Sequence, residues 1–376
     1  MEIRFATSKA TAAFRDRFAA VTGNREKLSP DNFRQSNSLS LSSIGIGTYL
    51  GNWDSDTDKK YTEAIVEYLR LGGNVIDTAP NYRFQRSERC IGEALRETKA
   101  ELTRDSIFVC SKGGYLPFDS EPPSDVANYF EENFVKTGVA KFEDLVGGSH
   151  CMTPGYLTSQ IEQSLRNMKI DGLDLFYIHN PESQLAEVDR YTFEARIAKA
   201  FEALETARSE AKINFYGVAT WNGFRIAPDE SVYHSLERFA NIARQVGGEA
   251  NGFKFVQLPY NLAMPEAFLV PNQAVKGKAL PTIQAAEDLG ISVMISAPLL
   301  QGQLAMNVPL NIRQALGALT TDAMTSLQFV RSTPGVTTAL VGMSSREHVV
   351  ENMALARKRI ASPDVFGDLF SGRQSA

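Results

Sequence analysis

The sequence predicts a (β/α)8 barrel, in which eight parallel strands close into a cylinder surrounded by helices. Eight short apolar runs rich in β-branched residues recur along the 376-residue chain. Segments with helical spacing of apolar residues separate them, and the runs are apolar almost throughout, which is typical of strands covered on both faces. Strict alternation of strand and helix favours a parallel sheet, and eight units favour closure of that sheet into a single-domain barrel.

The elements can be followed in order along the chain. The predicted strands are residues 43–49, 74–77, 106–112, 173–179, 214–220, 253–258, 291–297 and 339–343. Helices are expected between the strands, because apolar residues repeat there at spacings of three and four. One example contains Ile65, Tyr68 and Leu69 and ends at Gly72 and Gly73, which are typical residues at a helix stop.

A barrel of this kind needs roughly 250 residues, so about 100 residues lie outside it. We expect an N-terminal extension over residues 1–35, the barrel over 36–356 and a C-terminal tail over 357–376. An insertion of about residues 113–153 follows the third strand. Because loops at that end of a barrel carry the active site, we expect the insertion to overhang the catalytic face and shape the pocket.

Composition excludes several classes of protein. The chain has a net charge of -5 and 43% hydrophobic residues, so it is an ordinary globular sequence without the basic excess that binds nucleic acid or anionic membranes. We expect no membrane-spanning segment, since no apolar run approaches roughly 18 residues. Cys90, Cys110 and Cys151 are too irregularly spaced for a disulfide framework, which favours a cytoplasmic protein. The oligomeric state is not predicted.

Polar residues close several of the apolar runs. Asp77 ends the second run, Lys112 the third, His179 the fourth and Gln257 the sixth, while Tyr82 lies in the loop just after Asp77. Active sites of such barrels lie at the carboxyl ends of the strands. We therefore expect these side chains to face one cavity.

These residue types suit proton transfer to or from an oxygen atom. A tyrosine has a pKa of about 10, and a lysine ammonium at ~4 Å would favour the phenolate by on the order of 4 kcal/mol. Lys112 is therefore expected to lower the pKa of Tyr82, Asp77 to keep Lys112 charged, and His179 to orient the substrate oxygen. A hydride from a nicotinamide cofactor would complete the reduction of a carbonyl.

Other interpretations remain open at this point. Lys112 alone could form the Schiff base of a lyase or aldolase, and the fold could serve a nucleotide-binding regulatory protein. His150 and Cys151 could suggest a metal or nucleophile pair, although packing or pocket lining is expected and no metal site is predicted. Asp77 could cap a turn and Tyr82 could be a packed aromatic residue, if each is considered alone.

A set of motifs in a fixed order resembles the aldo-keto reductase superfamily from about residue 35 to 356. The motifs are "NVIDTAPNY", "IGEAL", "SK" at Lys112, "LDLFYIHNPE", "YGVATWN", "VQLPYNL", "APLLQGQL" and "VGMSSREHVVEN". The resemblance implies an NADP-dependent carbonyl reductase that acts on a small-molecule carbonyl or alcohol. It also implies that Asp77, Tyr82, Lys112 and His179 form a catalytic tetrad.

The same resemblance implies a cofactor site. Gln257 should contact the nicotinamide carboxamide, and since Ala219 and Thr220 replace the family's usual Ser-Asn pair, Thr220 or Asn222 should supply the second contact. Ser296 stands where a tyrosine often stacks on the nicotinamide, and Arg346 is the only obvious cation near the phosphates. NADP is expected, with NAD as the alternative. The expected cofactor-binding residues are Gly47, Thr48, Thr220, Trp221, Asn222, Gln257, Ser296, Pro298, Leu299, Gln301, Ser344, His348, Glu351 and Asn352.

Overall fold

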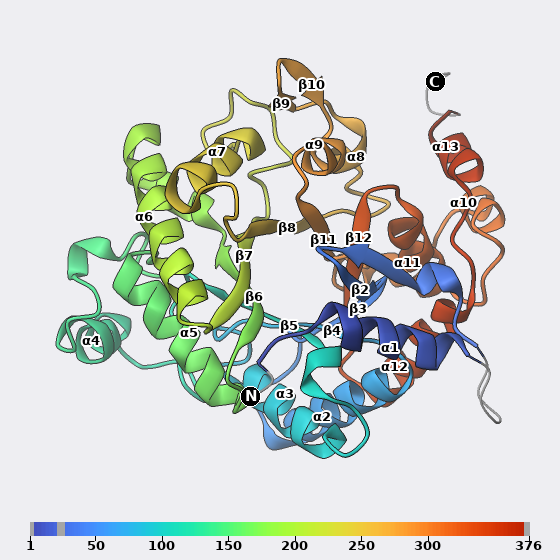
Figure 1. Ribbon diagram of the computed structural model, residues 1–376, viewed down its shortest axis with the longest axis horizontal. Helices are drawn as coiled ribbons and strands as arrows, with labels where there is room; N and C mark the ends of the chain where they lie inside the picture. Colours follow the sequence, from blue (N-terminus) through green and yellow to red (C-terminus); the bar gives the residue numbers. More distant parts are fainter. Residues whose placement is uncertain (1–3, 21–26, 372–376) are drawn as a thin grey trace.

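The structure, a computed structural model, describes residues 4–20 and 27–371 and has a closed parallel barrel at its centre (Figure 1). Strands are hydrogen-bonded in the order β11-β12-β3-β4-β5-β6-β7-β8. The predicted eight-stranded barrel is therefore confirmed. The barrel strands are β3 Ile44–Gly47, β4 Val75–Asp77, β5 Phe108–Gly113, β6 Leu173–His179, β7 Ile213–Ala219, β8 Phe253–Pro259, β11 Ser292–Ser296 and β12 Val336–Gly342.

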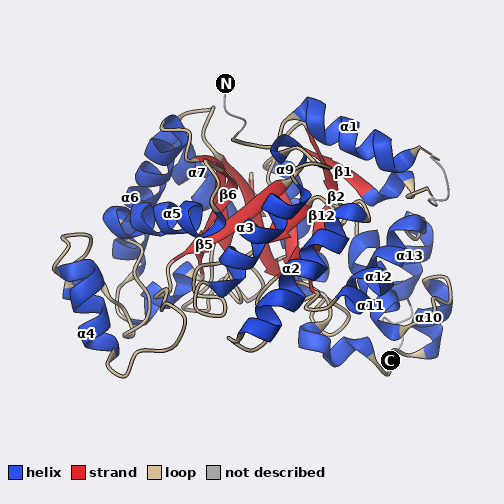
Figure 2. Cartoon of the chain, turned by 90° about the horizontal axis from the view of Figure 1, so that it is seen from below, coloured by secondary structure: helices blue, strands red, loops and turns tan. Residues whose placement is uncertain are grey.

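Helices surround the strands on the outside of the barrel (Figure 2). The predicted helix after the first barrel strand is α2, whose buried face includes Ile65, Tyr68 and Leu69. The helices around the barrel are α2 Ser55–Arg70, α3 Arg86–Thr98, α5 Pro154–Met168, α6 Arg190–Ser209, α7 Leu236–Gly247, α8 Glu266–Leu269, α9 Thr282–Asp288, α10 Leu310–Ala315, α11 Asp322–Ser332 and α12 Arg346–Ala354. In the described residues, none of the helices is long and apolar enough to cross a membrane.

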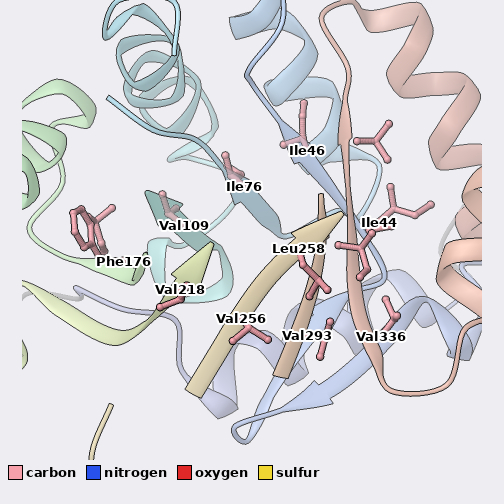
Figure 3. Close-up of a cluster of buried hydrophobic side chains, with 14 of the residues drawn as sticks. Ile44, Ile46, Ile76, Val109, Phe176, Val218, Val256, Leu258, Val293 and Val336 are labelled. Atoms are coloured by element: carbon pink, nitrogen blue, oxygen red, sulfur yellow. The ribbon is translucent and has the colours of Figure 1, made fainter. Parts of the chain in front are cut away.

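Alternation along the strands divides the core into two parts, because successive strand residues point to opposite faces of a sheet. Figure 3 shows the outer part, where Ile76 on β4, Val109 on β5 and Val256 on β8 belong to the large cluster that includes the helices. Their neighbours Val75 and Phe108 belong to a smaller cluster inside the barrel. The same alternation sends Asp77 and Lys112, two and four residues further on, into the barrel.

The N-terminal region covers the end of the barrel at which the strands begin. Helix α1, Ser8–Ala19, is followed by the antiparallel hairpin of β1 Phe33–Ser36 and β2 Leu39–Ser42. Leu39 and Leu41 join the cluster inside the barrel, beside the residues at the amino ends of the strands. The hairpin crosses the proposed boundary between residues 35 and 36, and residues 1–3 and 21–26 of the proposed extension lie outside the described residues.

The insertion after β5 forms its own small core. It contains α4 Val126–Phe130 and a π-helical turn over Glu131–Val135, and a cluster including Phe130, Phe134 and Tyr156 holds it against α5. Figure 1 shows α4 at the outer edge of the molecule, beyond α5. The part of the insertion around α4 thus lies beside the barrel rather than above its catalytic face, which corrects the expected overhang for that part.

Two further elements complete the chain. A small hairpin of β9 Gln273–Val275 and β10 Lys278–Leu280 lies after α8. Helix α13, Pro363–Ser371, ends the described chain, and its buried Phe366 packs against Phe329 of α11 and Phe268 of α8. Of the proposed tail, residues 372–376 lie outside the described residues.

Candidate active site

A cavity of about 890 Å³ lies at the carboxyl ends of the barrel strands. Asp77 and His179, the last residues of β4 and β6, open onto it, as does Gln257 near the end of β8. Its volume is in the range of sites that hold a cofactor or small molecule. The cavity brings together all of the residues predicted for the site except Lys112 and Asn222.

Lys112 lies buried behind the cavity wall, where it forms a close pair with Asp77. Its Nζ donates to Asp77 Oδ1 at 2.5 Å and to the Thr78 carbonyl oxygen at 3.0 Å. Burial is the largest single effect and lowers the pKa of Lys112, but the charges of Asp77 and Tyr82 and the hydrogen bonds to both together outweigh it, and the net pKa is raised above 10.5. Gln257 Nε2 donates to the other oxygen of Asp77 at 2.9 Å. The predicted pairing is confirmed, and Lys112 remains protonated at neutral pH.

Tyr82 lies above this pair, with Lys112 Nζ 4.8 Å from the centre of its ring. The Tyr82 and His179 rings lie edge to face with their centres 6.0 Å apart, and the centres of the Tyr82 and Tyr49 rings are 5.0 Å apart. Burial raises the pKa of Tyr82, and the opposing effect of Lys112 is smaller. The expectation that Lys112 brings this pKa below 10 is therefore wrong, because loss of hydration outweighs the Coulombic attraction. Tyr82 is a neutral phenol at neutral pH.

The loop after Tyr82 has an unusual backbone. Arg83, Phe84 and Gln85 have φ angles of 48°, 54° and 68°, in the left-handed region that side chains larger than glycine seldom adopt. Contacts of the side chains compensate this strain: Arg83 donates to Asp58 at 2.5 Å, and Gln85 donates to the Pro117 carbonyl oxygen at 2.8 Å. Tyr82 is consequently held at the start of a well-anchored turn.

His179 is fixed from behind by the insertion. His150 Nε2 lies 2.7 Å from the His179 carbonyl oxygen, and Gln184 Nε2 lies 2.9 Å from His150 Nδ1. Because Gln184 donates to Nδ1, the proton of His150 is on Nε2 and is donated to His179. Burial, with the nearby charge of Lys112, lowers the pKa of His179 well below 6.5. Its imidazole is neutral and can donate one hydrogen bond into the cavity.

Glu182 organises the loop after β7. Its Oε1 accepts hydrogen bonds from Thr220 Oγ1 at 2.5 Å and from the backbone N–H of Trp221 at 3.0 Å. Burial raises the pKa of Glu182, but His234, with Nε2 3.4 Å from Oε2, and Thr220 outweigh it and the net pKa is lowered. The hydroxyl proton of Thr220 is thus used within the protein.

Asn222 does not line the cavity, so its side chain lies outside the place where the cofactor contact was expected. Its Oδ1 accepts from Arg225 at 3.2 Å on the exposed side of the loop. The backbone turn that lets Glu182 bind successive N–H groups directs this side chain outward. Trp221, 40% exposed, lines the cavity as predicted.

The far end of the cavity is formed by α12 and the loop before it. Ser344, His348, Glu351 and Asn352 line it. Asn352 is 4% exposed, and its Oδ1 is buried without a hydrogen-bond partner. A buried acceptor without a partner is costly unless a ligand satisfies it, so this end fits the donor groups of an adenine or ribose.

Arg346, expected near the phosphates, is directed elsewhere. Its Nε donates to Glu67 Oε2 on α2 at 3.0 Å, and its side chain is 65% exposed. It does not line the cavity. Arg346 is thus close to the expected phosphate-binding segment in the sequence, but its side chain lies outside the cavity.

Sequence reasoning missed several lining residues. Tyr49 lies two residues after β3, Asn180 follows His179, and Tyr115 lies at the start of the insertion. Asn180 Nδ2 donates to Tyr115 Oη at 3.2 Å. Only their position could have predicted these residues, since each lies within three residues of a strand end, where this fold places its functional groups.

Two alternative interpretations can now be tested against the geometry. Lys112 is buried, protonated and hydrogen-bonded to Asp77, whereas a Schiff base requires a neutral, accessible amine. His150 and Cys151 are both buried in packing contacts. Within the described ranges, no group of three or more His, Cys, Asp or Glu side chains is arranged to hold a metal ion.

Comparison with known proteins identifies relatives of the chain. NADH-specific methylglyoxal reductase of Escherichia coli (strain K12) is 25% identical over 271 residues, which are 71% of this chain and 66% of that protein. D-threo-aldose 1-dehydrogenase of Pseudomonas sp is 30% identical over 188 residues, 48% of this chain and 51% of that protein. Uncharacterized oxidoreductase YqkF of Bacillus subtilis (strain 168) is 24% identical over 341 residues, 85% of this chain and 89% of that protein. The chain thus spans about two thirds of the length of the methylglyoxal reductase and about half of the length of the aldose dehydrogenase.

Solved structures share the fold. An aldo/keto reductase from Klebsiella pneumoniae in complex with NADP and acetate has a TM-score of 0.59 at 21% identity, covering 91% of this chain and 95% of that one. The holo form of an aldo-keto reductase from Bacillus halodurans has a TM-score of 0.62 at 19% identity, covering 90% and 95%. The model of the Aldo/keto reductase family matches residues 43–367. With its barrel and the residues at its strand ends, this chain belongs to the aldo/keto reductase family.

Proposed function

We propose that the protein is an oxidoreductase that transfers hydride between a nicotinamide dinucleotide and a small carbonyl compound or alcohol, with Tyr82 as general acid or base. One observation carries the proposal. Tyr82, His179 and the Asp77–Lys112 pair meet at one end of a single cavity whose other end holds the unpartnered Asn352 Oδ1. The cavity can therefore hold a long ligand with its reactive end beside a proton donor.

The residues of the chain provide the proton and the orientation. Tyr82, a neutral phenol, donates its proton to the carbonyl oxygen as negative charge develops there. The neutral His179 ring donates a hydrogen bond to the same oxygen and orients the carbonyl. A bound nicotinamide supplies the hydride that adds to the carbonyl carbon. Together one hydride and one proton convert the carbonyl to an alcohol.

Lys112 and Asp77 act through Tyr82 without touching the substrate. When Tyr82 has given up its proton, the ammonium of Lys112 stabilises the phenolate electrostatically. Asp77 keeps Lys112 charged in a site where burial alone would lower its pKa. In the reverse direction the same phenolate accepts the proton of an alcohol.

The residues at the cofactor site fit a dinucleotide. Trp221 and Ser296 lie near the reactive end, and Ser344 and Asn352 at the far end of the same cavity. NADP was the expected cofactor, and the first relative described above is NADH-specific by name. The proposal is for a nicotinamide dinucleotide of either kind.

The first experiment is a titration of the purified protein with NADH and NADPH, following tryptophan emission. The chain has two tryptophans, of which Trp221 lines the cavity, so saturable quenching is expected for at least one cofactor. Addition of a panel of aldehydes and ketones should then oxidise the bound cofactor, seen as a loss of absorbance. A folded protein that binds neither cofactor contradicts the proposal.

A second result separates an enzyme from a regulatory protein on the same fold. Tight cofactor binding with no oxidation by any carbonyl, and no reduction by any alcohol, would favour the regulatory interpretation. Trp53→Phe serves as the spectroscopic control, because Trp53 is exposed and does not line the cavity, so the quenching signal of Trp221 should persist without it.

A further inference from the structure

We infer that this cavity selects a dinucleotide whose adenosine ribose carries a free 2'-hydroxyl, so that NAD(H) binds more tightly than NADP(H). The inference rests on the proposed function and concerns the far end of the same cavity. It departs from the NADP expected from the sequence.

The lining of the cavity, within the described residues, includes neither lysine nor arginine. A ribose 2'-phosphate carries roughly two negative charges near neutral pH and is recognised by lysine or by the fork of an arginine. Ser344 stands in the lining before α12 and offers a hydroxyl only. A hydroxyl can bind another hydroxyl but cannot neutralise a phosphate.

Arg346, the nearest arginine along the chain, is held away from the cavity. Its side chain crosses to α2 and donates to Glu67 Oε2 at 3.0 Å. The Arg346 side chain is 65% exposed and that of Glu67 is 16% exposed, so the pair is partly solvated and fixes the direction of Arg346 with only a small energy. Turning Arg346 toward a phosphate would leave Glu67 without its partner.

Glu351 adds a carboxylate to the same end of the cavity. One of its oxygens accepts a hydrogen bond from Thr321 Oγ1 at 2.7 Å, which fixes the side chain while it lines the cavity. A carboxylate repels a phosphate but accepts hydrogen bonds from ribose hydroxyls, and acidic residues select NAD in this way in other dinucleotide sites. Asn352, next in the chain, also lines this end of the cavity, carries no charge, and has a buried Oδ1 without a hydrogen-bond partner.

The test compares dissociation constants of the full chain for NADH and NADPH by calorimetry at pH 8. We expect NADH to bind at least tenfold more tightly, about 1.4 kcal/mol. Adenosine 5'-monophosphate and its 2'-phosphorylated form, used as competitors, should show the same order because they probe the adenosine end alone.

Variants assign the effect to residues. Glu351→Gln keeps the acceptor for Thr321 but removes the charge, so it should reduce the NADH-to-NADPH ratio at least threefold. Ser344→Arg should strengthen NADPH binding at least tenfold. Glu347→Gln is the matched control, because it removes a charge from the exposed side of the same helix, outside the cavity lining, and should leave the ratio unchanged.

The possible failures are distinguishable. NADPH binding as tight as or tighter than NADH overturns this inference but leaves the oxidoreductase proposal intact. An unchanged ratio in Glu351→Gln, or an equal change in Glu347→Gln, overturns the assignment to Glu351. Binding of neither cofactor to folded protein removes the proposed function and this inference together.

Discussion

The two ends of the cavity are built in opposite ways. At the reactive end the charged groups are buried and paired: Lys112 is 1% exposed and bonded to Asp77, which is held in turn by Gln257. At the far end Arg346 is 65% exposed and paired with Glu67 outside the cavity. The first arrangement depends on strands inside the barrel, and the second on a surface helix.

This difference separates two kinds of constraint. Groups on adjacent barrel strands have positions fixed by the sheet, so their chemistry follows from the fold. Side chains on the exposed turn of α12 can change without disturbing the core, because they contribute little to its packing. Reaction chemistry should therefore be robust and cofactor preference adjustable within this architecture.

The largest effect is expected at Tyr82. Tyr82→Phe removes the proton donor and keeps the ring between Tyr49 and His179, so kcat should fall by roughly 10³-fold while cofactor affinity stays within about twofold. Stopped-flow measurement of hydride transfer tests this. Tyr49→Phe is the control, since it removes a hydroxyl from the adjoining ring and should reduce kcat less than about fivefold. Retained turnover in Tyr82→Phe would show that Tyr82 is not the proton donor at the reactive end.

Asp77→Asn should reduce both activity and stability. Lys112 would remain buried without a counter-charge, and the free energy of unfolding should fall by about 3 kcal/mol, measured by urea denaturation. Because the pKa of Lys112 is raised above 10.5, the stabilisation by the charged lysine is complete below that pH and is lost as pH rises through the raised value. The difference in free energy of unfolding between the variant and the unchanged protein should thus be constant from about pH 6 to 9.

Glu93→Gln provides the surface comparison for that measurement. Glu93 pairs with Lys169 at 3.1 Å on the exposed side of the molecule, and exposed pairs contribute less than about 1 kcal/mol. An equal loss of stability in Glu93→Gln and Asp77→Asn would show that burial does not make the Asp77–Lys112 pair more costly to break than an exposed pair.

The pH dependence should differ between the two directions of reaction. The pKa of Tyr82 is raised above 10 and that of His179 lies well below 6.5, so neither group titrates between about pH 7 and 9. Carbonyl reduction uses the protonated phenol, and its kcat should be nearly flat over that range. Alcohol oxidation needs the phenolate and should accelerate with rising pH. A reduction rate that falls steeply between pH 7 and 9 would show that Tyr82 is not a neutral donor.

The smallest effect is expected at the far end. Arg346→Gln removes an exposed ion pair and should change the free energy of unfolding by less than about 0.5 kcal/mol, measured by thermal or urea unfolding. Affinity for NADH should remain within about twofold, because Arg346 does not line the cavity. A tenfold loss of NADH affinity would place this arginine at the phosphates and weaken the contrast between the two ends.

The sequence by itself determined the barrel and the position of its reactive groups. Apolar runs of the right length predicted all eight strands, and a polar residue at a strand end is directed into the barrel by the two-residue period. That regularity brought Asp77, Lys112 and His179 to one place. The motifs around them also predicted most of the cavity lining, including Ser344 and Asn352.

Only the tertiary structure decided the details that depend on competing partners. Asn222 turned outward because Glu182, outside the predicted site, binds the backbone around it. The pKa of Tyr82 rose because burial outweighed Lys112, and Arg346 was withdrawn because Glu67 on α2 lies within reach. Local patterns specify which groups a strand or loop presents. The balance of hydration, charge and hydrogen bonding depends on residues distant in the sequence, and it exists only once the chain has folded.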